Sequence, residues 1–120
     1  MKYFFDTYAI IEIIKKNEKF APYEKEEITT SVLNIGELYY ALLRDFDEKT
    51  ADTWIEKLRP VSVSIDIDTV VEAMKFKSKN KEKGLSFVDV CSYAIAEKLG
   101  LVLLTGDKGF LGLSGAEVVQ

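Results

Sequence analysis

Four acidic residues of this sequence each stand as the only charged residue in a long uncharged stretch. They are Asp6 within residues 3–11, Glu37 within 28–43, Asp89 within 84–96 and Asp107 within 99–107. Because charged residues make up 30% of the chain, this isolation predicts that each acid is partly buried. Carboxylate oxygens bind hard cations such as Mg²⁺ and Mn²⁺, and ions held in this way activate water against phosphodiester bonds. The four acids therefore indicate nuclease or phosphatase chemistry, provided that the fold brings them together.

Three of these acids also have an ordinary structural interpretation. Ser86-x-x-Asp89 has the spacing of a capping-box variant, which by itself serves only to start a helix. Asp6 and Asp107 each follow a predicted strand, where turn and cap aspartates are common. Glu37 is harder to explain in this way, because a carboxylate in the middle of an apolar helix is uncommon unless it is paired or ligating. The set of four carries the functional hypothesis.

Composition limits the alternatives. The chain has 120 residues and a mass of 13.6 kDa, which predicts a single domain over residues 1–120. It contains no histidine, and this excludes serine-histidine hydrolases, two-histidine ribonucleases and the usual catalytic zinc sites. The single cysteine, Cys91, excludes an internal disulfide and favours a reducing, cytoplasmic location. No uncharged apolar stretch approaches the length of a membrane span, so we expect a soluble protein.

The predicted elements alternate between strands and helices. Strands are expected at 3–5, 28–30, 61–65, 101–104 and 117–119, and helices at 9–14, 32–43, 48–58, from 66 or 68 to 79, and 86–99. This order predicts an α/β fold whose mainly parallel sheet of four to five strands is covered by helices on both faces. Function in such sheets collects at the carboxyl ends of the strands, where the four acids can meet. Two carboxylates about 4 Å apart repel by roughly 4 kcal/mol at an effective dielectric of 20, so a cluster requires a cation or protons.

Four segments in this order resemble the PIN domains, especially the short bacterial and archaeal VapC-type toxins. The segments are Phe4-Phe5-Asp6-Thr7-Tyr8-Ala9, Ser31-Val32-Leu33-Asn34-Ile35-Gly36-Glu37-Leu38, Leu85-Ser86-Phe87-Val88-Asp89 and Leu103-Leu104-Thr105-Gly106-Asp107-Lys108-Gly109-Phe110. Each is weak alone, but their order and spacing agree over nearly the whole chain. The resemblance implies a three-layer α/β/α fold and a metal-dependent endoribonuclease.

Carried over residue by residue, the resemblance also implies a site. The acidic set would hold Mg²⁺ or Mn²⁺ and orient the attacking water, and it comprises Asp6, Glu37, Asp89 and Asp107. Thr7 and Thr105 would be hydroxyl neighbours of this site. Many members have a further acid two residues after the last one, where this chain has Gly109, and this departure makes a one-metal resting site plausible. The family also implies a homodimer that is held inactive by a small antitoxin.

Contacts with RNA and with protein partners have candidate residues of their own. Lys108, next to Asp107, is placed to contact a phosphate, although the net charge of −4 weighs against nucleic-acid binding. A cluster of alternating lysines comprises Lys75, Lys77, Lys79, Lys81 and Lys83. These lysines either contact the RNA substrate or form the solvated end of a helix. One predicted helix carries a further apolar group, Tyr39, Tyr40, Leu42 and Leu43. These residues form a contact with a second copy or an antitoxin, or else they belong to the core.

Two other functions compete with the nuclease. A non-catalytic PIN-fold protein that binds RNA or a partner is favoured by Gly109 and by the acidic pI, and it is opposed by the presence of all four acids. A receiver domain of a signalling protein has a similar length and also has acidic strand ends. It requires an acidic pair after the first strand, where this chain has Asp6-Thr7, so this alternative is the weaker one.

Overall fold

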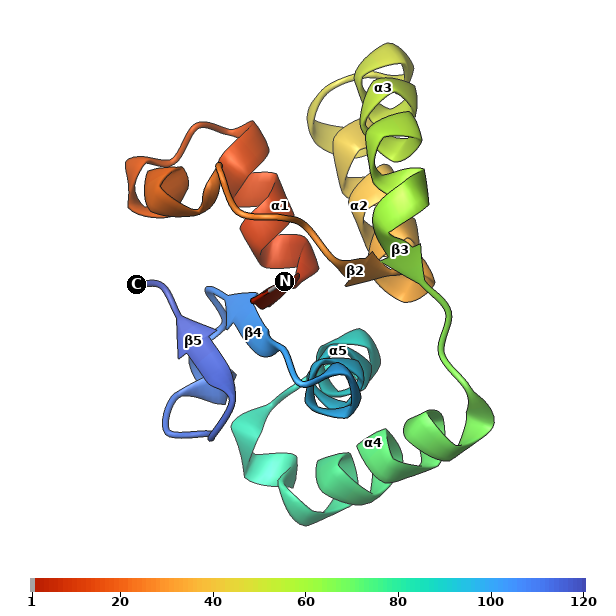
Figure 1. Ribbon diagram of the computed structural model, residues 1–120, viewed down its shortest axis with the longest axis vertical. Coiled ribbons are helices and arrows are strands. Elements are labelled where there is room, and N and C mark those ends of the chain that lie inside the picture. Colours follow the sequence, from red (N-terminus) through yellow and green to blue (C-terminus); the bar gives the residue numbers. More distant parts are fainter. Residues whose placement is uncertain (1) are drawn as a thin grey trace.

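The computed structural model describes residues 2–120 as alternating strands and helices (Figure 1). The strands are β1 (Tyr3–Phe5), β2 (Thr30–Ser31), β3 (Ser62–Val63), β4 (Val102–Thr105) and β5 (Ala116–Val118). The α-helices are α1 (Thr7–Ile14), α2 (Val32–Asp45), α3 (Glu48–Leu58), α4 (Ile67–Lys79) and α5 (Phe87–Leu99). Short 3₁₀ helices are η1 (Glu18–Tyr23), η2 (Arg59–Val61), η3 (Lys81–Lys83) and η4 (Lys108–Phe110).

The strands form a parallel sheet in two hydrogen-bonded parts. One part has the order β1-β4-β5 and the other pairs β2 with β3, and all three pairings are parallel. The parts are joined where the Phe5 amide donates to the Thr29 carbonyl at 2.8 Å and the Thr30 hydroxyl donates to the Phe5 carbonyl at 2.9 Å. The predicted mainly parallel sheet is therefore confirmed.

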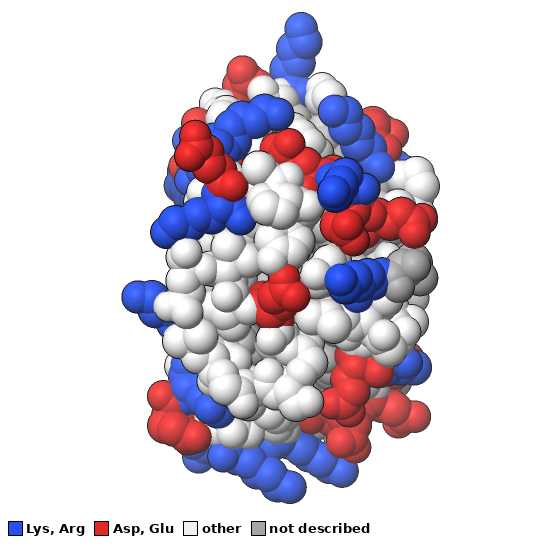
Figure 2. Space-filling view, turned by 60° about the vertical axis from the view of Figure 1, so that its left-hand side comes forward, with Lys and Arg blue, Asp and Glu red and all other residues white. Residues whose placement is uncertain are grey.

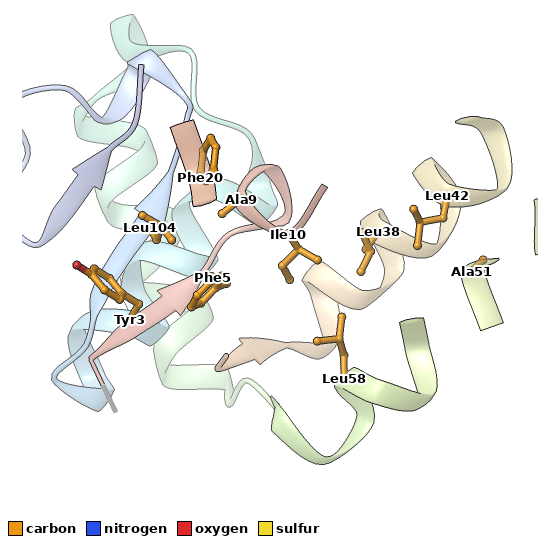
Figure 3. Close-up of a cluster of buried hydrophobic side chains, with 10 residues drawn as sticks. All are labelled: Tyr3, Phe5, Ala9, Ile10, Phe20, Leu38, Leu42, Ala51, Leu58 and Leu104. Carbon is orange, nitrogen blue, oxygen red and sulfur yellow. The ribbon is translucent and has the colours of Figure 1, made fainter. Parts of the chain in front are cut away.

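Alternating side chains of the central strands supply a hydrophobic core to each face of the sheet. Tyr3, Phe5 and Leu104 belong to one core, which Figure 3 shows together with residues of α1, α2 and α3. Phe4 and Leu103 belong to the other core, beneath α4 and α5. Figure 1 shows the same division, with α1, α2 and α3 on one side of the strands and α4 and α5 on the other. The three-layer α/β/α arrangement follows from this alternation.

Local capping fixes where the helices begin and end. The Asp66 side chain accepts from the Thr69 amide at the start of α4, and Ser86 starts α5. Gly100 ends α5 in a left-handed conformation with φ of 70°, which glycine adopts without steric cost. Helix α3 has the predicted bounds. The third strand, predicted at 61–65, spans only Ser62–Val63, and it begins one residue late because Pro60 lies in η2, whose turn extends to Val61.

The apolar segments serve the core and do not reach membrane-spanning length. The α2 helix is the longest at 14 residues, whereas a membrane span needs about 20 apolar residues. Within residues 2–120, no helix is long and apolar enough to cross a membrane. Cys91, the single cysteine, is fully buried in the core beneath α4 and α5.

Candidate active site

The four isolated acids meet in one open cleft of about 360 Å³. Asp6 is the N-cap residue of α1 directly after β1, and Asp107 is the N-cap residue of η4 after β4. Glu37 lies in α2, whereas Asp89 lies in the first turn of α5. Parallel strands bring their carboxyl ends to one edge of the sheet, and the first turns of the following helices lie at the same edge. The four acids therefore line one cleft at this edge of the sheet, as predicted.

Asp6 is the most enclosed of the four acids, with only 2% of its surface exposed. Its Oδ1 accepts a hydrogen bond from the Thr7 amide at 2.8 Å, and its Oδ2 accepts one from the Thr105 hydroxyl at 2.8 Å. The Thr105 hydroxyl in turn accepts from the amide of Asp107 at 3.1 Å. Thr105 is fully buried and links two of the acids through this one hydroxyl.

Burial and mutual repulsion both act on the acidic cluster. Burial raises the pKa of Asp6 to about 7, and the negative charges of Asp89 and Glu37 add to this rise, although hydrogen bonds from Thr105 and Thr7 oppose it. Burial also raises the pKa of Asp89, and the neighbouring Asp107 carboxylate raises it further. Repulsion thus acts between three pairs of carboxylates: Asp6 with Asp89, Asp6 with Glu37, and Asp89 with Asp107. Each repulsion disfavours the state in which both members of the pair are negatively charged.

A buried asparagine that the sequence analysis did not single out connects the elements that carry these acids. The side-chain amide of Asn34 donates to the Thr7 hydroxyl at 3.1 Å and to the Ser92 hydroxyl at 3.0 Å, and it lies 3.4 Å from Asp6 Oδ1. Its carbonyl oxygen accepts from the Ser31 hydroxyl at 2.6 Å. Asn34 therefore ties α2 to the start of α1 and to α5.

This network also sets the direction of the Thr7 hydroxyl. Thr7 has one hydroxyl proton, and because it accepts from Asn34, that proton is directed to Glu37 Oε1 at 2.7 Å. Asn34 and Glu37 are three residues apart on α2, which places them on the same side of the helix. On α5, Ser92 and Asp89 have the same spacing. A polar residue three positions from each of these two helical acids is the sequence signal that could have identified the network.

Asp89 combines a structural role with its place in the cleft. The Ser86 amide donates to Asp89 Oδ2 at 2.8 Å, and the Asp89 amide donates to the Ser86 hydroxyl at 3.1 Å. This is the reciprocal capping box that the spacing predicted. The Asp89 side chain nevertheless lines the acidic cleft, so the two interpretations hold together.

Some predicted site residues differ from expectation in exposure or position. The prediction of partial burial is wrong for Glu37, which is exposed because its side of α2 forms an open wall of the cleft. Lys108 is exposed and does not line the cleft, and neither do the lysines of α4 and η3. In the latter group Lys77 donates to the Leu85 carbonyl and Lys75 pairs with Glu72. The cleft lining includes one basic residue, Arg44, which the sequence analysis did not consider.

The donor set fits a hard divalent cation, although the side chains do not yet enclose one. The four carboxylates line a single cleft and supply the oxygen ligands that Mg²⁺ and Mn²⁺ prefer. Nevertheless, no three acidic or cysteine side chains of residues 2–120 converge closely enough to hold an ion in this arrangement. Cation binding would therefore require the carboxylates to draw together, which their mutual repulsion opposes until a positive charge is present.

The segment after Asp107 has no room for a further acid. A Cβ atom at Gly109 would lie 2.6 Å from Leu85 Cδ2 and 2.8 Å from the Lys83 carbonyl oxygen. The backbone carbonyl cannot move aside as the end of a flexible side chain would. In addition, the Gly109 amide donates to Asp107 Oδ1 at 2.8 Å and so holds that carboxylate.

We predict that Gly109→Asp lowers the free energy of unfolding by about 1–3 kcal/mol because of this overpacking, without tighter Mn²⁺ binding. Urea unfolding and calorimetric Mn²⁺ titration measure the two quantities. Gly109→Ala should show a similar loss, whereas Gly36→Ala, whose new Cβ meets no atom within 4 Å apart from its chain neighbours and its own helix backbone, should gain up to about 1 kcal/mol. Tighter Mn²⁺ binding by a fully stable Gly109→Asp variant would contradict this explanation.

The protein is thus a three-layer α/β protein with a parallel sheet and a cleft lined by carboxylates at the carboxyl ends of the strands. The sequence matches the PIN domain profile over residues 3–115, and the chain therefore belongs to the PIN domain family. No curated protein sequence matches it.

Solved structures share this fold over nearly the whole chain. VapC20 from Mycobacterium tuberculosis, described as a sarcin-ricin loop cleaving toxin, is 20% identical with a TM-score of 0.81, covering 99% of this chain and 100% of that chain. PAE2754 from Pyrobaculum aerophilum is 26% identical with a TM-score of 0.70, covering 99% and 90% of the two chains. A chain of a toxin-antitoxin complex from Klebsiella pneumoniae is 18% identical with a TM-score of 0.75, covering 99% and 98%.

Proposed function

We propose that this protein is a Mg²⁺- or Mn²⁺-dependent endoribonuclease that cuts RNA at the acidic cleft. One observation carries the proposal: four carboxylates from four separate elements line one cleft at the carboxyl ends of the strands of a PIN domain. Caps and turns explain the acids one at a time, but they do not explain why all four meet. The relative described as a sarcin-ricin loop cleaving toxin supports RNA as the substrate.

The roles of the residues follow from their contacts. Asp6, Glu37, Asp89 and Asp107 would hold the cation, and such an ion when bound polarises a phosphate and lowers the pKa of a bound water. The Thr105 hydroxyl fixes one oxygen of Asp6, and the Thr7 hydroxyl fixes one oxygen of Glu37. Because the sequence has no histidine, proton transfer in the cleft falls to carboxylates and water.

RNA cleavage tests this proposal with Asp89→Asn as the decisive variant. We expect the wild type to cut single-stranded or structured RNA in Mg²⁺ or Mn²⁺, and we expect excess chelator or Asp89→Asn to abolish the cut. Asparagine keeps the side-chain oxygen that accepts from the Ser86 amide, so the helix cap survives. Asp68→Asn, an exposed change in the first turn of α4, is the matched control and should cut like the wild type.

The same assay separates the nuclease from its nearest competitor. RNA binding without turnover in any metal, by a folded wild type, would favour a non-catalytic PIN-fold binding protein. Cleavage that persists in chelator would contradict the metal-dependent mechanism.

We also propose that the protein is the toxin of a toxin-antitoxin pair and forms a homodimer. The toxin-antitoxin complex from Klebsiella pneumoniae supports the first part, because one of its chains has the same fold. Of the four apolar residues considered for such contacts, Leu42 is buried and Tyr39 packs partly on the core, whereas Tyr40 and Leu43 are exposed. Val32 on the same helix and Phe46, its C-cap residue, add exposed apolar surface. Light scattering should give twice the chain mass of 13.6 kDa, and the chain mass itself would contradict the dimer.

A further inference from the structure

Besides the four carboxylates and Thr7, the acidic cleft is lined by Tyr8, Ile11, Tyr40, Ala41 and Arg44. Tyr8 directly follows Thr7 in the first turn of α1. Tyr40 and Arg44 are three and seven residues after Glu37 on α2, so the helix presents an acid, an aromatic ring and a cation to the cleft at successive turns.

The Tyr8 ring is fixed beside the acids and still has one exposed side. It lies so close to the Gly106 backbone that a Cβ atom there would be 2.1 Å from the Tyr8 Cε1 atom. On another side it packs against Phe20, with ring centroids 6.2 Å apart. Gly106 lies between Thr105 and Asp107, so this contact holds the ring next to the acidic cluster. The remaining 45% of the residue surface is exposed.

The two tyrosines of the cleft differ from the other four in the chain. The hydroxyls of Tyr3 and Tyr23 donate to Glu117, that of Tyr39 donates to Asp52, and that of Tyr93 donates to the Ser114 carbonyl. Within residues 2–120, the hydroxyls of the two cleft tyrosines make no such bond. Tyr40 is also 69% exposed, which is high for a ring of its size. Both rings are therefore available to a ligand.

Electrostatic attraction offers little help in holding an RNA at this cleft. The chain has a net charge of −4, and Arg44, the one cation of the lining, is already paired with Asp45 at 2.9 Å. On the one face of the molecule that Figure 2 shows, basic and acidic side chains are interspersed around a largely uncharged middle, in keeping with the small net charge of the whole chain. Aromatic stacking does not depend on charge and contributes to the binding of unpaired bases in many nucleic-acid-binding proteins.

We propose that Tyr8 and Tyr40 stack on an unpaired base of the RNA next to the cleavage site. The inference rests on the proposed nuclease function and assigns two residues that would position an unpaired base of the substrate at the cut. A base within a duplex has both faces covered by its neighbours, so it cannot enter the cleft without leaving the stack.

The test measures binding separately from cleavage. A short RNA with a single 2-aminopurine base is titrated with the Asp89→Asn protein in chelator, either as a single strand or annealed to its complement. We expect the protein to quench the 2-aminopurine fluorescence of the single strand and to leave that of the duplex unchanged. Tyr40→Leu and Tyr8→Leu should each weaken single-strand binding about tenfold and reduce the quenching, whereas Tyr40→Phe and Tyr8→Phe should retain both. Tyr39→Leu, on the same helix but directed to Asp52, should bind like the parent protein.

Parallel cleavage assays distinguish failure of this inference from failure of the nuclease proposal. With the wild-type acids in Mn²⁺, the leucine variants should raise KM while kcat changes little. Metal-dependent cleavage with an unchanged KM in both leucine variants, or equal cutting of duplex and single strand, overturns the stacking role and leaves the nuclease standing. If the wild type cuts no RNA, both proposals fail. A Tyr40→Leu variant that binds RNA normally but changes its state of association would assign Tyr40 to a protein contact and overturn its role here.

Discussion

Replacing Asp6 by asparagine is expected to reduce metal-dependent RNA cleavage by about 10³-fold or more. A bound cation contributes several kcal/mol to the stabilisation of a phosphodiester transition state, and loss of about 4 kcal/mol corresponds to this factor. Asp6 is the most buried of the four acids, and the charges of both Asp89 and Glu37 contribute to the rise of its pKa. Asparagine preserves its size and can still accept from the Thr7 amide, so the start of α1 should persist. Initial cleavage rates at saturating Mn²⁺ measure the effect.

A thermal shift provides a second measurement of the same substitution. A ligand that binds only the folded state raises its stability, so Mn²⁺ should raise the Tm of the wild type and leave that of Asp6→Asn unchanged. Asp68→Asn, at an exposed residue that does not line the cleft, should respond to Mn²⁺ like the wild type. A folded Asp6→Asn protein with more than a tenth of wild-type cleavage would contradict the role of Asp6.

Replacing Asn34 by alanine is expected to lower both stability and activity. Asn34 is fully buried, and its removal leaves the hydroxyls of Ser31, Thr7 and Ser92 without one of their partners. We expect a loss of about 3 kcal/mol in the free energy of unfolding, because unsatisfied buried polar groups are costly. Cleavage should fall by roughly 10- to 100-fold even in fully folded protein, as is typical when residues that orient metal ligands are removed.

Urea unfolding and cleavage rates at a temperature where the variant is folded separate the two effects. Asn80→Ala is the matched control, because that side chain also donates a hydrogen bond, to the Phe76 carbonyl, but lies outside the acidic cleft. It should lose about 1 kcal/mol and cleave normally. If the activity of Asn34→Ala falls only in proportion to its unfolded fraction, Asn34 has no positioning role.

Local patterns account for most of the fold that the sequence predicted. Helix α3 has its predicted bounds because Asp47 caps its start and Pro60 follows its end. Strands β4 and β5 lie within one residue of their predicted positions. The 3₁₀ helix η1 was not predicted. Its only buried residue is Phe20, and the segment has no apolar periodicity from which a helix could be read.

The acids of the candidate site and the neighbouring hydroxyls of Thr7 and Thr105 were predicted, but other supporting residues were not. An acid isolated among apolar residues is visible in the sequence because it departs from the expected composition. Asn34 and Tyr8 are ordinary residues locally, and their roles arise only when α1, α2, α5 and the Gly106 backbone pack together. The exposure of Glu37 also depends on this packing, because helical periodicity cannot show that one side of α2 borders an open cleft.

Calorimetric titration of Mn²⁺ into the metal-free protein tests most directly whether the four acids form a cation site. We predict saturable binding by the wild type and by Asp68→Asn, and loss of that binding in both Asp6→Asn and Asp89→Asn. The measurement needs no knowledge of the RNA substrate. Equal Mn²⁺ binding by the wild type and both cleft variants, or no binding by a wild type that still cuts RNA in chelator, would contradict the metal-dependent nuclease.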